Sequence, residues 1–336
     1  GCYLLPGIID DHVHFRDPGL THKADILTES RAAAAGGVTS IMDMPNTNPL
    51  TVTLDALNAK LDLLNEKCIV NHSCYFGATN NNYTEFDKLD KHRVCGIKLF
   101  MGSSTGNMLV DKMNSLLNIF NGTDMLIAAH CEDQETIKNN IEKYKQKYKG
   151  ADDIPVSAHP SIRSVPACYA SSELAVRLAK IAGARLHILH VSTAKELQLF
   201  SDVPLANKNI TAEACVAHLL FTLTHYNSLG ARIKCNPAVK RKTDREALRT
   251  AVNSGLIDVI ATDHAPHLLS EKEGGALKAM SGMPMIQFSL VSMLELVDEG
   301  VFSLETVVQK MCHAPARIYG ICQRGYIREG YQADLV

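Results

Sequence analysis

The sequence lacks the features by which several classes of protein are identified. Its 336 residues carry 34 Lys and Arg against 36 Asp and Glu, and this near balance gives no electrostatic reason to expect a nucleic acid or a membrane as partner. No N-terminal signal peptide is visible, and no apolar run is long enough to span a membrane. The sequence begins at Gly1 without a Met, as a trimmed part of a longer protein would.

The ten cysteines include no C-x-x-C pair. A chain of this length does not need disulfides to hold its core. We therefore expect reduced, mostly buried thiols and a cytoplasmic location.

Short apolar, β-branched segments alternate with helical patterns along the chain. Eight segments read as strands: 7–14, 38–44, 68–76, 95–100, 125–130, 185–190, 209–215 and 258–263. Helical patterns lie between most of them, among them 28–35, 54–65, 171–182 and 245–254. This alternation predicts parallel strands with right-handed crossovers, and eight units suit an α/β fold of the (β/α)8 TIM-barrel type. The competing architecture is a doubly wound open sheet, but no Gly-rich phosphate loop follows the first strand.

We assign residues 7–320 to the barrel. Within it, an apolar helix is expected over 284–297 and another from Ser303, whose hydroxyl suits an N-cap. Residues 1–6 and 321–336 are interpreted as remnants of a small β-sandwich subdomain, with 325–336 forming a hairpin.

Imidazole and carboxylate groups fall at the C-terminal ends of the predicted strands, where the reactive groups of such barrels lie. His12 and His14 end the first strand and, being two residues apart, point the same way. Strands five, six and eight end in His130, His190 and Asp263, and strand four contains Lys98. One strand-end histidine is a weak signal, but the ordered set suits zinc and similar divalent metals.

The other histidines receive simpler interpretations. Surface or packing positions are expected for His22, His72, His92, His159, His225 and His313. His187 lies three residues before His190 and should face the other way, His264 should support Asp263 from behind, and His218 is left open.

Six motifs together resemble the dihydroorotases of the amidohydrolase superfamily, over nearly the whole chain. They are PGIIDDHVHFRDPG (6–19), GGVTSIMDMPNTNP (36–49), GIKLF (96–100), AHCED (129–133), LHILHVST (186–193) and ATDHAPH (261–267). The resemblance implies a TIM barrel with a small β-sandwich built from both chain ends. It also implies two divalent metal ions, with zinc as the default.

The resemblance implies two sets of metal ligands in this sequence, one for each ion. One ion would be held by His12, His14 and Asp263, and the other by His130 and His190. A carboxylated Lys98, formed with carbon dioxide, would bridge both. Some bacterial relatives carry Asp at this place, whereas an uncarboxylated, cationic Lys98 would be repelled by the metals.

The resemblance also implies the reaction. Reversible hydrolysis and cyclisation would interconvert (S)-dihydroorotate and N-carbamoyl-L-aspartate in de novo pyrimidine (UMP) biosynthesis. A metal-bound hydroxide would attack the ring, with Asp263 as general base and then general acid. Arg16 would bind the substrate carboxylate, while Asn46, Asn236 and His267 would contact the substrate. The Gly/Ser/Thr loop 102–109 is a candidate lid, with Thr105 at its tip.

Alternatives remain open. Within the same class the chain could be an allantoinase or a hydantoinase-type cyclic amidohydrolase; from a different class, it could be a catalytically inactive amidohydrolase-like scaffold. One departure is Val216-Ala217-His218, where many dihydroorotases have Pro-His-His. Homodimers are common in the family, and a homodimer is the oligomer that the resemblance suggests.

Overall fold

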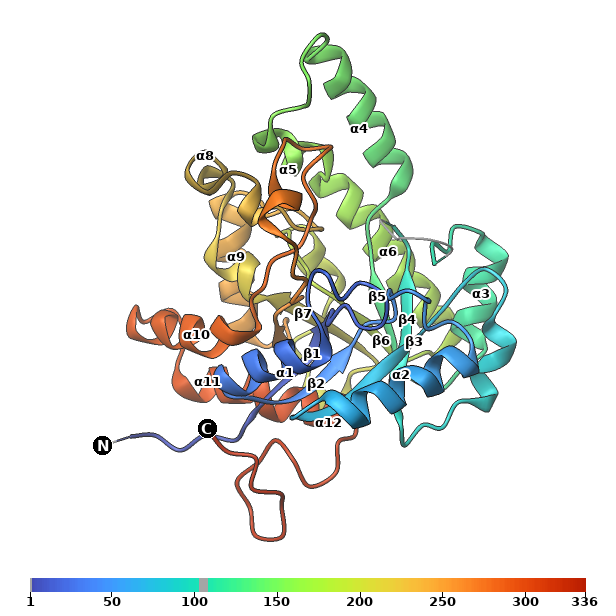
Figure 1. Ribbon diagram of the computed structural model, residues 1–336, viewed down its shortest axis with the longest axis vertical. Coiled ribbons are helices and arrows are strands. Elements are labelled where there is room, and N and C mark those ends of the chain that lie inside the picture. The colour runs from blue at the N-terminus through green and yellow to red at the C-terminus, as the bar shows by residue number, and fades with distance from the viewer. Residues whose placement is uncertain (1, 103–107) are drawn as a thin grey trace.

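The computed structural model describes residues 2–102 and 108–336. Its eight strands are all parallel and pair in sequence order, which confirms the predicted (β/α)8 barrel (Figure 1). They are β1 (Ile8–Val13), β2 (Val38–Asp43), β3 (Asn71–Gly77), β4 (Val94–Phe100), β5 (Ile127–His130), β6 (Leu186–Ile188), β7 (Ile210–Cys215) and β8 (Val259–Ala261).

The barrel closes just beyond β8. The His14 N–H donates to the His264 carbonyl at 2.7 Å, and the His264 N–H donates to the His12 carbonyl at 3.2 Å. This closure joins the end of β1 to the segment that follows β8, and so brings the two ends of the barrel sequence to one place.

The helices connect and cover the strands. They are α1 (Ile26–Ala35), α2 (Leu54–Lys67), α3 (Met113–Asn121), α4 (Gln134–Lys147), α5 (His159–Ile162), α6 (Val165–Ala182), α7 (Val216–Leu220), α8 (Tyr226–Leu229), α9 (Lys242–Ser254), α10 (Ser289–Asp298), α11 (Leu304–Val308) and α12 (Ala314–Ile318). The predicted cap at Ser303 is confirmed, since its hydroxyl accepts from the Thr306 N–H at 3.1 Å.

Alternate strand residues pack on opposite sides of the sheet, as the two-residue period of a strand requires. Ile8 and Ile41 belong to the large apolar cluster between strands and helices. Their neighbours Ile9 and Met42 belong to a second cluster with Tyr75, which includes Ala316 of α12. This apolar packing against α12 leaves the carboxyl ends of the strands for polar groups.

The two termini lie near each other, away from the projecting helix α4 (Figure 1). The predicted hairpin over 325–336 is wrong: these residues form turns, and Leu335 forms an antiparallel bridge with Pro6 instead. The backbone groups of Leu5 and Val336 bond to each other at 2.8 and 3.0 Å, so the last residues pair with the N-terminal segment, while within the C-terminal segment the Gln332 N–H donates to the Gln323 carbonyl at 2.9 Å. The division into a 7–320 barrel and β-sandwich remnants stays a prediction.

Across the described ranges, no helix combines the length and the apolar character needed to cross a membrane.

Candidate metal centre

All ten residues predicted for the site line one cavity of about 910 Å³. They are His12, His14, Arg16, Asn46, Lys98, His130, His190, Asn236, Asp263 and His267. Because parallel strands present their carboxyl ends at one mouth, residues of β1, β4 and β5 meet here with residues of the segments after β1, β2, β6, β7 and β8.

Three ligand atoms converge in the first half of the site. Asp263 Oδ1 lies 3.2 Å from His12 Nε2 and 3.1 Å from His14 Nε2. The other nitrogen of each ring is held from behind: His12 Nδ1 is 3.0 Å from Glu213 Oε1, and His14 Nδ1 is 2.7 Å from Asn46 Oδ1. With a metal at the centre, each ring would donate its Nδ1 hydrogen to the oxygen behind it and present the Nε2 lone pair to the metal.

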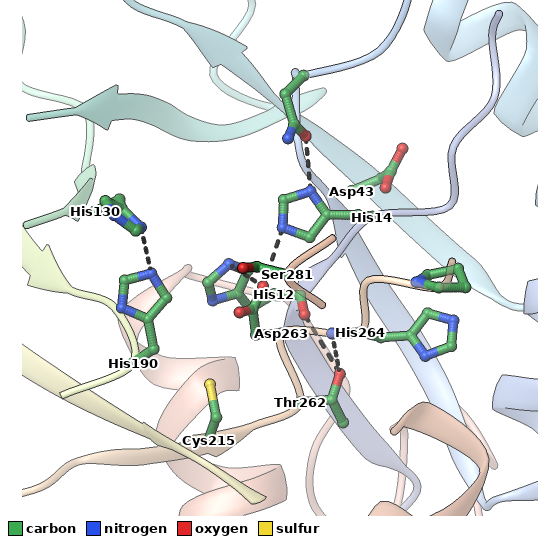
Figure 2. A network of polar contacts seen from close by, with 12 residues as sticks. His12, His14, Asp43, His130, His190, Cys215, Thr262, Asp263, His264 and Ser281 are labelled. Atoms are coloured by element: carbon green, nitrogen blue, oxygen red, sulfur yellow. Dashed lines mark hydrogen bonds and ion pairs between the residues drawn. The ribbon is translucent and has the colours of Figure 1, made fainter. Parts of the chain in front are cut away.

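Two imidazoles form the second half. His130 Nδ1 and His190 Nε2 face each other at 2.8 Å, as Figure 2 shows, with His12 and Asp263 lying toward His14. The opposite nitrogen of His130 lies 3.0 Å from Glu132 Oε2, so the Nδ1 lone pair is the one directed at His190. His190 Nδ1 is buried with no hydrogen-bond partner among the described residues.

Lys98 lies close to both halves. Its ammonium is buried; its charge adds to the burial that lowers the pKa of His130, and it opposes Glu213 and Asp263, which raise the pKa of His12. Burial lowers the pKa of Lys98 itself to about 8, against the attraction of Asp263 and Glu213. A neutral amine is therefore more accessible here than on an exposed lysine.

The protonation states suit a divalent metal. Burial lowers the pKa of His14 to about 4 and that of His190 well below its ordinary value, so both are neutral donors. Burial alone would raise the pKa of Asp263, but His12, His14 and Lys98 outweigh it, and the pKa falls below its usual value. His12 is the exception, because Glu213 and Asp263 overcome its burial and raise its pKa. The neutral imidazoles of His14, His130 and His190 and the carboxylate of Asp263 fit the ligand preferences of zinc and its neighbours, and a bound metal would require His12 to be neutral as well.

The backbone is strained at three of these residues. Arg16, His190 and Asp263 have φ of 68°, 39° and 49°, in the left-handed region that side-chain-bearing residues rarely adopt. Such conformations cost on the order of 1–3 kcal/mol each and concentrate at functional sites. His190 and Asp263 lie two residues beyond the ends of β6 and β8, so this backbone turn, rather than strand alternation, aims their side chains.

A cationic group borders the metal centre. Arg16 donates from Nε to the Pro266 carbonyl at 3.1 Å, and its Nη2 lies 3.1 Å from His267 Nε2. On the other side of that imidazole, Nδ1 lies 3.2 Å from Lys23 Nζ. Within the described part of the chain no carboxylate forms an ion pair with Arg16, which leaves its guanidinium available for an acidic ligand.

Several residues around the cavity were missed or placed differently by sequence reasoning. His159, expected at a surface or packing position, is buried, lines the cavity and contacts Asn236 Oδ1 at 3.1 Å. Arg163 also lines it and pairs with Glu132. A charged residue inside a predicted strand, such as Glu213 in ITAEAC, is the signal that could have been used, because a buried charge requires a partner.

The remaining histidines near the site have separate partners. His264 turns away from Asp263 (Figure 2), and its Nε2 lies 2.6 Å from Glu29, so its expected support of Asp263 stays a prediction. His218 is buried against the Pro237 carbonyl at 3.0 Å and is not among the cavity-lining residues. His187, expected to face away, is buried 3.3 Å from Asp11 Oδ2. Thr105, the candidate lid residue, lies outside the described residues.

Comparison with known proteins agrees with this geometry. The model of the amidohydrolase family matches residues 3–336. The chain belongs to the amidohydrolase family.

Curated relatives and a solved structure extend the match. A dihydroorotase of Methanosphaera stadtmanae is 33% identical over 339 residues, which cover 99% of this chain and 75% of that protein. A dihydroorotase of Halobacterium salinarum is 34% identical over 335 residues, covering 99% and 76%. The L-hydantoinase (dihydropyrimidinase) of Arthrobacter aurescens superposes with a TM-score of 0.93 at 30% identity, covering 99% of this chain and 75% of that one. The curated dihydroorotases and the L-hydantoinase structure both indicate that this amidohydrolase is a hydrolase of cyclic amides.

Proposed function

We propose that this amidohydrolase is a dihydroorotase, which interconverts (S)-dihydroorotate and N-carbamoyl-L-aspartate. One observation carries the proposal: Arg16, which forms no ion pair within the described residues, lies beside a convergent set of metal-ligand atoms in one cavity. A cyclic amide that bears a carboxylate matches both parts, since the guanidinium fork binds the carboxylate while the ring amide faces the metal centre. The relatives named dihydroorotase support it.

Two divalent metal ions, zinc by default, would be held by this chain's own ligands. His12, His14 and Asp263 would hold one, and His130 and His190 the other. Such ions activate water and polarise a carbonyl oxygen when they are bound. Lys98 would bridge them as a carbamate: its neutral amine adds to carbon dioxide and loses a proton, which replaces a repelled cation with an anionic ligand.

Asp263 would move the proton in this reaction. As an ionised carboxylate it accepts the proton of the attacking water, and it then delivers that proton to the ring nitrogen as the amide bond breaks. Arg16 and His267 would hold the carboxylate end of the ring, while Asn46 would hold both His14 and the substrate edge. Asn236, placed by its contact with His159, would contact the ring from the other side.

We further propose a cytoplasmic enzyme with a small-molecule substrate and without nucleic acid or membrane partners. The ten cysteines are all free, which suits a reducing compartment. A homodimer remains a prediction.

A hydantoinase-type activity is the second candidate. Beyond the metal centre the cavity has an apolar wall made of Ile137, Ile141, Ile162, Leu277 and Met280. Dihydroorotate has no apolar substituent to pack against this wall, whereas a cyclic ureide with an apolar substituent would bury that substituent there. The likeness to an L-hydantoinase supports this candidate.

One assay decides between them. Protein with a counted metal content is given dihydroorotate, hydantoin, 5-benzylhydantoin and allantoin in parallel, and ring opening is followed. Turnover of dihydroorotate alone, with up to two metals per chain, is the expected result. Preference for 5-benzylhydantoin would establish the second candidate. If the protein binds two metals but turns over none of these compounds, its substrate is a different one. If it binds no metal and is inactive, the catalytically inactive amidohydrolase-like scaffold is favoured.

A further inference from the structure

Glu213 is a buried carboxylate that contacts both halves of the metal centre. It lies within β7, and its side chain is fully buried. Its Oε1 accepts from His12 Nδ1 at 3.0 Å and from the backbone N–H of His190 at 2.8 Å. These two residues are ligand candidates for different ions, so a single oxygen atom connects the two sites.

The opposite oxygen of Glu213 faces a second buried group. Oε2 lies 3.8 Å from His187 Nε2, and the same nitrogen lies 3.3 Å from Asp11 Oδ2. The His187 ring is fixed in turn by Thr211 Oγ1, 2.7 Å from its Nδ1. A buried carboxylate is costly unless it is paired and hydrogen-bonded; Glu213 Oε1 has hydrogen bonds, whereas Oε2 has the ion-pair contact with His187 and no hydrogen-bond partner among the described residues.

We propose that Glu213 is a positioning residue for the metal centre, anchored from behind by the His187 and Asp11 pair. Acceptance of the Nδ1 hydrogen fixes the His12 ring so that Nε2 points at His14 and Asp263. Acceptance of the His190 N–H holds that backbone at its positive φ of 39°, the turn that aims His190 at His130. The inference rests on the proposed metal site, not on the identity of the substrate.

The test measures metal binding rather than turnover. Wild-type protein is stripped with a chelator and titrated with Zn²⁺ by calorimetry, and the variants Glu213→Ala and Glu213→Gln are treated alike. Alanine removes the acceptor, so zinc affinity should fall about 10–100-fold. Glutamine keeps an acceptor oxygen but loses the charge, so its affinity should lie between those of wild type and alanine. If the alanine variant does not fold, the glutamine variant still carries the test.

Glu196 provides a matched control. It is equally buried, but its carboxylate accepts from Ser172 Oγ at 2.7 Å and Thr193 Oγ1 at 2.8 Å and touches no proposed ligand. Glu196→Ala and Glu196→Gln should change zinc affinity by less than about twofold.

Three outcomes would overturn the inference. The first is a zinc affinity equal to that of wild type in both Glu213 variants. The second is a loss of zinc affinity in the Glu196 variants as large as in the Glu213 variants. The third is a third zinc ion that binds to wild type and is absent in Glu213→Gln. The last would mean that Asp11, His187 and Glu213 themselves hold an ion, since their ligand atoms lie within 4.8 Å of one another. Normal zinc binding without dihydroorotate turnover would instead refute only the proposed substrate.

Discussion

Asp263 has two proposed tasks, metal ligation and proton transfer, which one substitution separates. In Asp263→Asn the amide oxygen still faces His12 and His14, but it cannot take a proton at neutral pH. We expect kcat to fall about 10²–10⁴-fold, the usual contribution of a positioned acid–base group, with metal still bound. Turnover and metal content measured on the same sample check this, and an active Asn variant would contradict the role.

Arg16 should discriminate between substrates by their charge. A hydrogen bond to a charged group contributes about 1.5–3 kcal/mol, so Arg16→Ala should lower kcat/KM for dihydroorotate by roughly 10–100-fold. Hydantoin, which has no carboxylate, should lose much less. The ratio of the two kcat/KM values is the measurement, and an equal loss for both substrates would remove Arg16 from carboxylate recognition.

Glu132 gives a prediction about pH. Burial would raise its pKa, but Arg163 and His130 lower it to about 2, against 4.5 for the free side chain. A lowered pKa means stability that is fully present above pH 4.5 and is lost as the pH falls toward 2. The difference between the two pKa values of Glu132 corresponds to about 3 kcal/mol in the free energy of unfolding. In urea unfolding of the metal-free protein, wild type should exceed Glu132→Gln at pH 6 and the two should converge near pH 2; parallel curves would exclude this linkage.

The six metal-ligand candidates could be predicted from fold position, because strand ends meet at one mouth, and Arg16, Asn46, Asn236 and His267 from the family resemblance; all ten line one cavity. Glu132 and Glu213 could not be predicted in the same way. Their roles depend on which nitrogen of a histidine they face and on the pairing of β7 with β6, and neither is visible in a residue pattern. The sequence pattern therefore predicts the metal-ligand candidates, whereas the carboxylates that orient their imidazole rings are found only in the structure.

Among the elements, the segment after β8 forms a wall of the cavity through Met280, Ser281 and Gly282. The Lys272 ammonium holds it, donating to the carbonyls of Lys234, Met280 and Gly282 at 2.8–2.9 Å. Asp153 fixes the same segment by accepting from the Gly275 N–H at 2.7 Å. The wall is therefore held by polar contacts rather than by a helix or strand.

Removal of this lysine should loosen the wall without disturbing the metals. In Lys272→Met the carbonyls of Met280 and Gly282 lose this donor, while that of Lys234 keeps the Gly282 N–H at 2.9 Å. We expect a stability loss of about 1–3 kcal/mol, faster amide exchange over 276–282 and a roughly tenfold lower kcat/KM. Lys278→Met is the control, because Lys278 is exposed and its ammonium pairs, among the residues described, only with exposed Asp152. Unchanged exchange in Lys272→Met would show that the wall is fixed by other contacts.

Strands and helices were predicted well where periodicity is strong, as in β1, β4 and α9. The pairing of the chain ends was not predicted. Residues 325–336 include turn-forming residues that suit a hairpin, yet Leu335 pairs with Pro6. A pairing partner more than 300 residues away leaves no local signal, and local turn chemistry cannot decide between the two.

For the molecule as a whole, the proposed metal ions would join strands that are distant in the sequence. His12 and Asp263 come from the two ends of the barrel sequence, which meet through the closure at His264, while His130 and His190 join β5 to β6. A ligand that binds the folded state alone stabilises it by about 4 kcal/mol when free ligand is 1,000 times Kd. For a chain of 336 residues this corresponds to a Tm increase of about 6 °C per ion.

We therefore expect zinc added to chelator-treated protein to raise Tm by about 6–12 °C, in calorimetry at a fixed scan rate. His12→Ala should keep only part of this increase, because the ion held by His130 and His190 can still bind. His92→Ala should keep all of it, since His92 is exposed and does not line the cavity. An increase that is equal in all three proteins would place the stabilising zinc elsewhere, and no increase in wild type would mean that the barrel closes without metal.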